Sequence, residues 1–157
     1  MPRALNISEA AAIALHTMAA LASEPESSMT TREIAVKLLG SESHLSKVLQ
    51  RLAKAGFVSA KSGPGGGFSL ALAAADINML DVFEAIDGPI DSCCTQTPAV
   101  CDGRTCIFGQ LVAIVNMQVR DYLGGIRLSE LHLEGPGRLV RLPRNGTRPS
   151  REEEVTK

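Results

Sequence analysis

The four cysteines are the residues with the clearest capacity for chemistry, and all fall in one short segment: Cys93, Cys94, Cys101 and Cys106. Zinc sites usually begin with a Cys-x2-Cys pair, and this segment contains none. Thiolates at wider spacings in an irregular loop can hold an iron-sulfur cluster, which needs one further ligand from elsewhere. A redox-active thiol pair and buried free cysteines remain as alternative interpretations.

The composition bounds the scaffold that holds these cysteines. With 157 residues, 45% of them apolar, the chain suffices for one domain, or one domain with an extension. One Tyr, four Phe and no Trp leave an aliphatic core, which favours packed helices over a sandwich or barrel. No apolar run approaches the roughly 20 residues of a membrane span, and no signal peptide is evident. We expect a cytoplasmic protein without membrane contact, where clustered cysteines indicate a metal or redox site.

Two helices are expected near the N-terminus. A helix over about residues 6–22 is predicted by apolar residues at three- and four-residue steps: Ile7, Ala11, Ala14, Met18 and Leu21. Thr30 and Glu33 have the spacing of a capping box and predict a short second helix, which Gly40 ends.

A third helix and a hairpin are expected next. Ser41 or Ser43 caps the helix, Gly56 follows its end, and its core face is Leu45, Val48, Leu49 and Leu52. Two apolar stretches, 57–60 and 68–72, flank a glycine-rich run and predict a β-hairpin with an exposed tip. Helix, turn, helix and hairpin in this order predict a winged helix, whose third helix enters the major groove of DNA.

The expected DNA contacts are the polar and basic residues on the outward surfaces of these elements. They are Thr31, Arg32, Ser43, His44, Ser46, Lys47, Gln50, Arg51, Lys61, Ser62, Gly65 and Gly66. Any helix also needs a solvated face, so the helix pattern alone does not establish that the protein binds DNA. Basic residues outnumber acidic ones before residue 71, whereas acidic residues outnumber basic ones over 71–135. The net charge of −1 therefore results from opposite charges in different segments that cancel each other.

Two further helices are expected after the hairpin. Asn78 caps one that runs to Asp87, before Gly88-Pro89. Apolar residues cover much of a long helix from Ile107 to Leu123, which predicts packing against a second copy, with a monomer core helix as the alternative.

The expected organisation is a DNA-binding domain (1–75), a linking helix and cysteine loop (76–104), a dimerisation helix with a C-terminal segment (105–134) and a disordered tail (135–157).

Several of these motifs together resemble a known family. The run from Gly56 to Phe68, the helix from Asn78 to Gly88-Pro89, the cysteine loop and residues 126–131 are similar to the winged-helix regulators that include IscR, NsrR and RirA. The resemblance covers about residues 3–133. It implies a homodimeric transcription regulator, repressor or activator, that binds an imperfect palindrome of double-stranded DNA with an affinity set by an iron-sulfur cluster.

The resemblance also implies a set of cluster ligands. Cys101 and Cys106 match the loop cysteines, and Cys94, with Cys93 as the alternative, supplies the first. The IscR-type histidine would fall at Gly109, so the fourth ligand implied is NsrR-like: Glu9 from the partner subunit. A 4Fe-4S cluster is favoured over a 2Fe-2S form. Without the family, Glu9 would be an ordinary first-turn glutamate favoured by the helix dipole.

The function expected from the whole sequence is a switch in which nitric oxide, redox state or iron-sulfur status changes operator affinity. A cluster-free regulator that senses oxidants through a disulfide and an iron-sulfur carrier protein are the alternatives. Nothing supports an enzyme, because the chain has neither a phosphate-binding loop nor a plausible pair of nucleophile and base. Ser62 and His44 stand where relatives often carry Arg and Tyr, so the operator sequence cannot be taken over from relatives.

Overall fold

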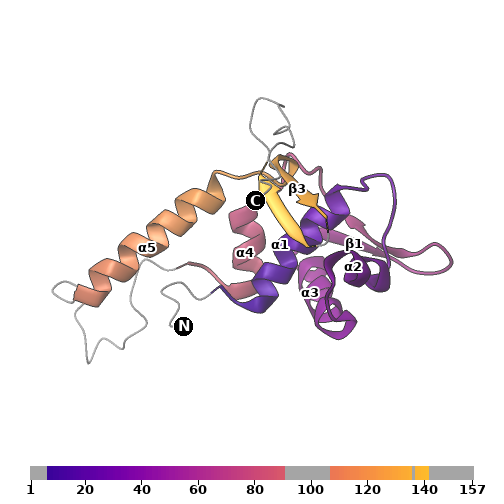
Figure 1. Cartoon of the computed structure of the whole chain (residues 1–157), viewed down its shortest axis with the longest axis horizontal. Coiled ribbons are helices and arrows are strands. Elements are labelled where there is room, and N and C mark those ends of the chain that lie inside the picture. Colours follow the sequence, from indigo (N-terminus) through magenta and orange to yellow (C-terminus); the bar gives the residue numbers. More distant parts are fainter. Residues whose placement is uncertain (1–6, 91–106, 136, 142–157) are drawn as a thin grey trace, which may run out of the picture.

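The computed structural model describes residues 7–90, 107–135 and 137–141 (Figure 1). The elements are α1 (Glu9–Ala22), α2 (Thr31–Leu38), α3 (Glu42–Lys54), β1 (Val58–Lys61), β2 (Gly67–Leu70), α4 (Met79–Asp87), α5 (Ile107–Gly124), the 3₁₀ turn η1 (Leu128–Glu130), β3 (Leu131–Glu134) and β4 (Arg138–Arg141). The mainly helical class with a winged helix and a long separate helix agrees with the fold expected from the sequence. Among the described residues, no helix is both long and apolar enough to cross a bilayer.

Helix α1 lies at the centre and packs against α2, α3, α4 and β3. Ser8 caps it, with its hydroxyl accepting a hydrogen bond from the backbone N–H of Ala11 at 3.0 Å. Four of the five expected apolar positions are buried, whereas Ile7 is 40% exposed because the helix begins only at Glu9. A helix surrounded in this way fixes the relative positions of its neighbours.

Helices α2 and α3 form the helix-turn-helix. Thr30 and Glu33 make the predicted capping box at the start of α2, and Leu39 ends it in the left-handed conformation at φ 52°, one residue before Gly40. Ser41 stands at the cap of α3 but makes no capping bond, and its hydroxyl lies 2.9 Å from that of Ser43. The predicted face of α3 is buried: Leu45, Val48, Leu49 and Leu52.

Strands β1 and β2 pair antiparallel, with Val58 opposite Leu70 and Lys61 opposite Gly67, and form the predicted wing. A β-bridge joins Met29, in the α1–α2 loop, to Phe68. A Cβ on Gly67 would lie 2.6 Å from the carbonyl oxygen of Met29, so only glycine allows this close approach. The wing is therefore attached to the helix-turn-helix.

The C-terminal part of the described chain differs from expectation. Residues Leu131–Glu134 and Arg138–Arg141 pair as the β3–β4 hairpin, although disorder was expected from residue 135. The hairpin is held because Arg141 Nη2 lies 2.6 Å from Glu130 Oε2 and because three leucines pack against the core: Leu131, Leu133 and Leu139. The expectation of a disordered tail was wrong for β4, and its remainder, 142–157, lies outside the described residues.

Candidate nucleic-acid interface and cysteine segment

The outward face of α3 carries short polar and basic side chains. Ser43, His44, Lys47 and Gln50 are exposed, and Ser46 is partly exposed. Residues three and four apart lie on the same side of a helix, so this face is continuous over successive turns. The structure thus brings together these predicted DNA contacts on a surface that solvent reaches.

The wing and the start of α2 hold the other predicted contacts. Arg32 is exposed and Thr31 half-buried in the first turn of α2, while Lys61 and Ser62 are exposed at the end of β1. Figure 1 shows the wing loop extending beyond α2.

The α1–α2 loop binds the tip of the wing. The hydroxyl of Ser28 donates to the carbonyl oxygen of Gly65 at 3.0 Å. The sequence reasoning missed Ser28, because a serine in a polar loop carries no signal of a partner 37 residues away.

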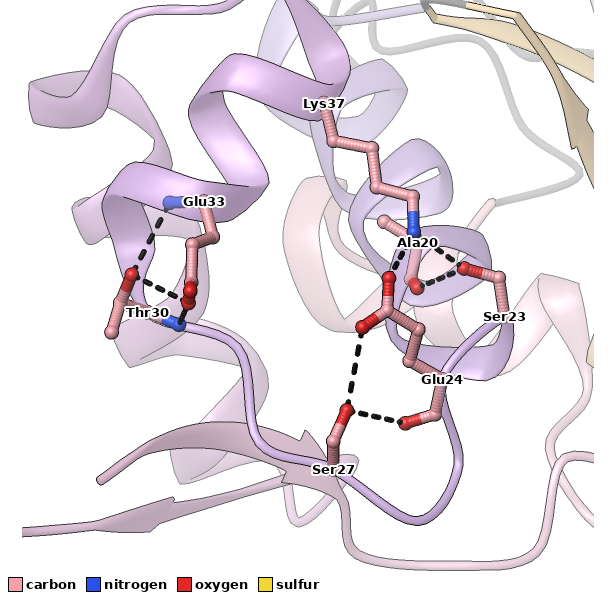
Figure 2. A network of polar contacts seen from close by, with 7 residues as sticks. All are labelled: Ala20, Ser23, Glu24, Ser27, Thr30, Glu33 and Lys37. Carbon is pink, nitrogen blue, oxygen red and sulfur yellow. Dashed lines mark hydrogen bonds and ion pairs between the residues drawn. The ribbon is translucent and has the colours of Figure 1, made fainter. Parts of the chain in front are cut away.

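A polar network holds both ends of α2 (Figure 2). The carboxylate of Glu33 accepts hydrogen bonds from the backbone N–H of Thr30 at 2.7 Å and from its hydroxyl at 2.8 Å. These bonds lower the pKa of Glu33. Lys37 Nζ lies 2.7 Å from Glu24 Oε1 and donates to Ser23 Oγ at 2.8 Å, and the lysine lowers the pKa of Glu24. Helix α2 is thus fixed to the end of α1.

Arg51, predicted to contact DNA, has another partner. Its guanidinium donates a hydrogen bond from Nη2 to the carbonyl oxygen of Ile86, which lies in the last turn of α4. Helix α3 is therefore bonded to α4, the helix that leads into the cysteine segment.

All four cysteines lie outside the described residues, so the structure tests none of the cysteine ligands. Among the described residues, no three His, Cys, Asp or Glu side chains gather as a metal site. Gly109, the position of the IscR-type histidine, is buried at the start of α5.

The residues on both sides of the cysteine segment are anchored. Glu84 Oε1 accepts from the backbone N–H of Ile90 and from Arg120 Nη1, both at 3.1 Å, and Arg120 also donates to the carbonyl oxygen of Ile90 at 3.0 Å. The ion pair between Glu84 and Arg120 thus joins α4 to α5. Both side chains also bind Ile90, the last described residue before the cysteine segment. Sequence reasoning missed this junction, because Glu84 and Arg120 are 36 residues apart and belong to different helices.

Glu9 lies at the start of α1 with its side chain 77% exposed. Its Oε1 atom is 3.8 Å from Nδ1 of His44, in the first turn of α3. Glu9 also lines a cavity of about 220 Å³ together with His16, whose ring Nδ1 lies 2.7 Å from the carbonyl oxygen of Ala12. The carboxylate is accessible to another molecule.

Helix α5 extends away from the rest of the fold in Figure 1. None of its residues from 110 to 124 is buried, although many are apolar. Four large apolar residues are more than half exposed: Leu111, Ile114, Met117 and Tyr122. The alternative that α5 is the core helix of a monomer is wrong for these described residues.

Comparisons with known proteins agree with this architecture. The chain is 34% identical over 90 residues to the regulator IscR of Vibrio vulnificus, a match that covers 57% of this chain and 54% of that protein. The chain thus spans about half the length of the curated relatives it matches.

Solved structures extend the likeness beyond the winged helix. CymR of B. subtilis, described as its global cysteine regulator, has a TM-score of 0.65 at 25% identity, covering 80% of this chain and 94% of that one. IscR of T. potens has the same TM-score at 23% identity, covers 80% of this chain and 85% of that one, and shows the fold.

One family model accounts for the winged helix and the elements after it together. The Rrf2 model, described as an iron-dependent transcriptional regulator, matches residues 7–134. This range includes the helix-turn-helix, the wing, the cysteine segment and α5. On this match over most of its length, the chain belongs to the Rrf2 family of transcriptional regulators.

Proposed function

We propose that this protein is a DNA-binding transcription regulator, and not an enzyme, that recognises an imperfect palindrome of double-stranded DNA. The exposed polar face of α3, beside a wing attached to the α1–α2 loop, carries the proposal. Short polar side chains suit base edges, and the lysines suit phosphates. The contacts retained in this proposal are Thr31, Arg32, Ser43, His44, Ser46, Lys47, Gln50, Lys61, Ser62, Gly65 and Gly66. Membership of a family of transcription regulators supports it.

The regulator acts as a homodimer in this proposal, with residues 1–75 on DNA and α5 at the interface. The exposed apolar residues of α5 support it, since a large apolar surface usually marks a contact with another protein. A two-fold dimer places its two α3 helices, which are the recognition helices of this proposal, on half-sites about one turn of DNA apart, and this matches a palindrome.

The proposed sensor is an iron-sulfur cluster, 4Fe-4S in preference to 2Fe-2S, held by Cys94, Cys101 and Cys106, with Cys93 as the alternative to Cys94. Glu9 from the partner subunit completes the ligand set. Three thiolates and one carboxylate form a donor set that suits iron, and the exposure of Glu9 leaves its carboxylate accessible. Such a cluster supplies an iron centre that nitric oxide or oxidants can attack.

The proposed switch acts through the placement of α1. A bond from Glu9 to the partner would hold α1 and so set the spacing of the two recognition helices. Support comes from the contacts at the start of α1, where Ser8 binds Asp87 and Glu9 lies beside His44. Loss of that bond would leave the distance between the two recognition helices unconstrained.

A cluster-free regulator that senses oxidants through a cysteine disulfide is the second candidate. The structural likeness to CymR favours it, because one similar structure, 26% identical with a TM-score of 0.62, is CymR of Staphylococcus aureus in an oxidized form.

Anaerobic purification with iron and sulfide analysis separates the two sensors. The proposal expects stoichiometric iron and sulfide, and a visible absorption that nitric oxide abolishes together with a change in affinity for a duplex selected from a random library. Iron-free protein whose DNA affinity follows reversible thiol oxidation would support the second candidate. Unchanged DNA affinity after complete cluster loss would overturn the switch.

Variants of Glu9 test the fourth ligand. The Glu9→Gln variant should lose its visible absorption faster in air than the wild type, because a neutral amide is a poor iron ligand. Glu26→Gln is the matched control, since Glu26 is an exposed loop carboxylate. Equal decay rates for all three proteins would exclude Glu9.

A further inference from the structure

Arg51 makes a contact that its position on the recognition helix does not suggest. It lies in the last turn of α3, and its guanidinium donates to the carbonyl oxygen of Ile86. Ile86 is itself buried in the last turn of α4. The guanidinium thus bridges two helices that pack against each other.

The end of α4 needs such a partner. The last four carbonyl groups of a helix have no hydrogen-bond donor within that helix, and the helix dipole puts partial negative charge there. Helix α4 has no basic residue in its own last turn. Arg51 therefore supplies both a donor and a positive charge that α4 lacks.

This contact distinguishes Arg51 from the two lysines of α3. Lys47 lies one turn before Arg51, and Lys54 lies with it in the last turn of α3. Both lysines are exposed, and the structure gives neither of them an ion pair among the described residues. A guanidinium bound to a carbonyl of its own protein is less available to a phosphate, whereas a free lysine is fully available.

We propose that Arg51 is a positioning residue that fixes the orientation of the recognition helix against the end of α4, rather than a phosphate contact. The proposal rests on the proposed DNA binding by α3. The turn of α4 that Arg51 holds also carries Asp87, which accepts from the backbone N–H of Ser8 at 3.3 Å. Arg51 thus ties the DNA-binding surface to the point where α1 and α4 meet, immediately before the cysteine segment.

The salt dependence of DNA binding separates the two roles. A phosphate contact releases counterions, so the slope of log K against log salt is negative, and loss of one contact makes it less steep by about 0.9. A positioning contact changes affinity at every salt concentration by the same factor, because the number of phosphate contacts in the complex stays the same. The two cases give lines of different slope.

The experiment compares the full-length wild type with Arg51→Gln, Arg51→Lys and Lys47→Gln on one fluorescent duplex selected from a random library. Binding is measured at several salt concentrations, below the unfolding temperature of every variant. We expect Arg51→Gln to bind about tenfold more weakly with the wild-type slope, and Arg51→Lys to recover most of the loss, since an ammonium still donates to a carbonyl. Lys47→Gln should make the slope less steep by about 0.9.

The other outcomes are equally informative. A less steep slope for Arg51→Gln would make Arg51 a phosphate contact and overturn the proposal. Wild-type affinity for a folded Arg51→Gln would make the contact purely structural and also overturn it. Failure of the wild type to prefer the selected duplex over a scrambled one would instead refute the proposed function. If Arg51→Gln does not fold, Arg51→Met carries the test, because it keeps the aliphatic stem but removes the positive charge: a wild-type slope at reduced affinity supports positioning, and a less steep slope opposes it.

Discussion

The hydroxyl of Ser8, the residue that caps α1, donates a hydrogen bond to the carboxylate of Asp87, the last residue of α4. The same hydroxyl accepts from the N–H of Ala11, so one small side chain serves both helices. Because the end of a helix disfavours a negative charge, Asp87 would weaken α4 without this donor. The bond therefore joins the start of one helix to the end of another.

Removal of the Ser8 hydroxyl should lower the stability of the protein. We expect Ser8→Ala to reduce the free energy of unfolding by about 1–2 kcal/mol, because it removes a helix cap and a charge-assisted hydrogen bond. Urea denaturation measures the change. A double-mutant cycle with Asp87→Asn should give a coupling of at least about 0.5 kcal/mol. With Asp81→Asn, an exposed acid at the other end of α4, the coupling should vanish, and equal couplings would contradict the assignment.

Substitution of Gly66 should disrupt the wing. A Cβ at this position would lie 2.3 Å from the carbonyl oxygen of Lys61, and backbone cannot easily move away. We expect Gly66→Ala to bind the selected duplex about tenfold more weakly while the helical core stays folded. Anisotropy and circular dichroism measure the two effects. Gly124→Ala is the control, because its Cβ would meet only Leu80 at 3.7 Å, and an equal loss of binding there would refute the explanation.

The capping box of α2 should make stability depend on pH. Hydrogen bonds from the backbone and side chain of Thr30 hold the pKa of Glu33 below its usual value of 4.5. A lowered carboxyl pKa contributes stability that is fully present above the unfolded pKa and is lost as pH falls through the folded pKa. Wild type should therefore lose more stability between about pH 5 and pH 3 than Glu33→Gln. Urea midpoints at both pH values provide the measurement, with Glu26→Gln, which should follow the wild type, as control.

A charge on the exposed face of α5 should break the dimer. Ile114 and Met117 are 55% and 53% exposed, and we propose that a second copy covers them. The change Ile114→Glu would bury a carboxylate in that interface, which is costly without a partner. Light scattering should give half the wild-type mass. Val36→Glu makes the same kind of change at a residue that is 68% exposed on α2 and should leave the mass unchanged. A monomeric wild type would refute the proposed dimer.

The sequence alone predicts the elements that depend on nearby residues. The capping box of Thr30 and Glu33 spans three residues, and Asn78 accepts from the N–H of Leu80, two residues on. The glycine run marks the wing, because positive φ values at its tip exclude most side chains. Four leucine and valine positions mark the buried face of α3. Each of these signals is local, which is why sequence carries it.

The tertiary structure decides the contacts between distant residues. Ser8 and Asp87 are 79 positions apart, and Arg51 and Ile86 are 35 apart. The β3–β4 hairpin likewise depends on packing against a core that is formed elsewhere in the chain. A periodic pattern shows which face of a helix is buried, but an arginine on the other face has the same pattern whether it binds a phosphate or a neighbouring carbonyl. Only the placement of α4 beside α3 distinguishes these roles for Arg51.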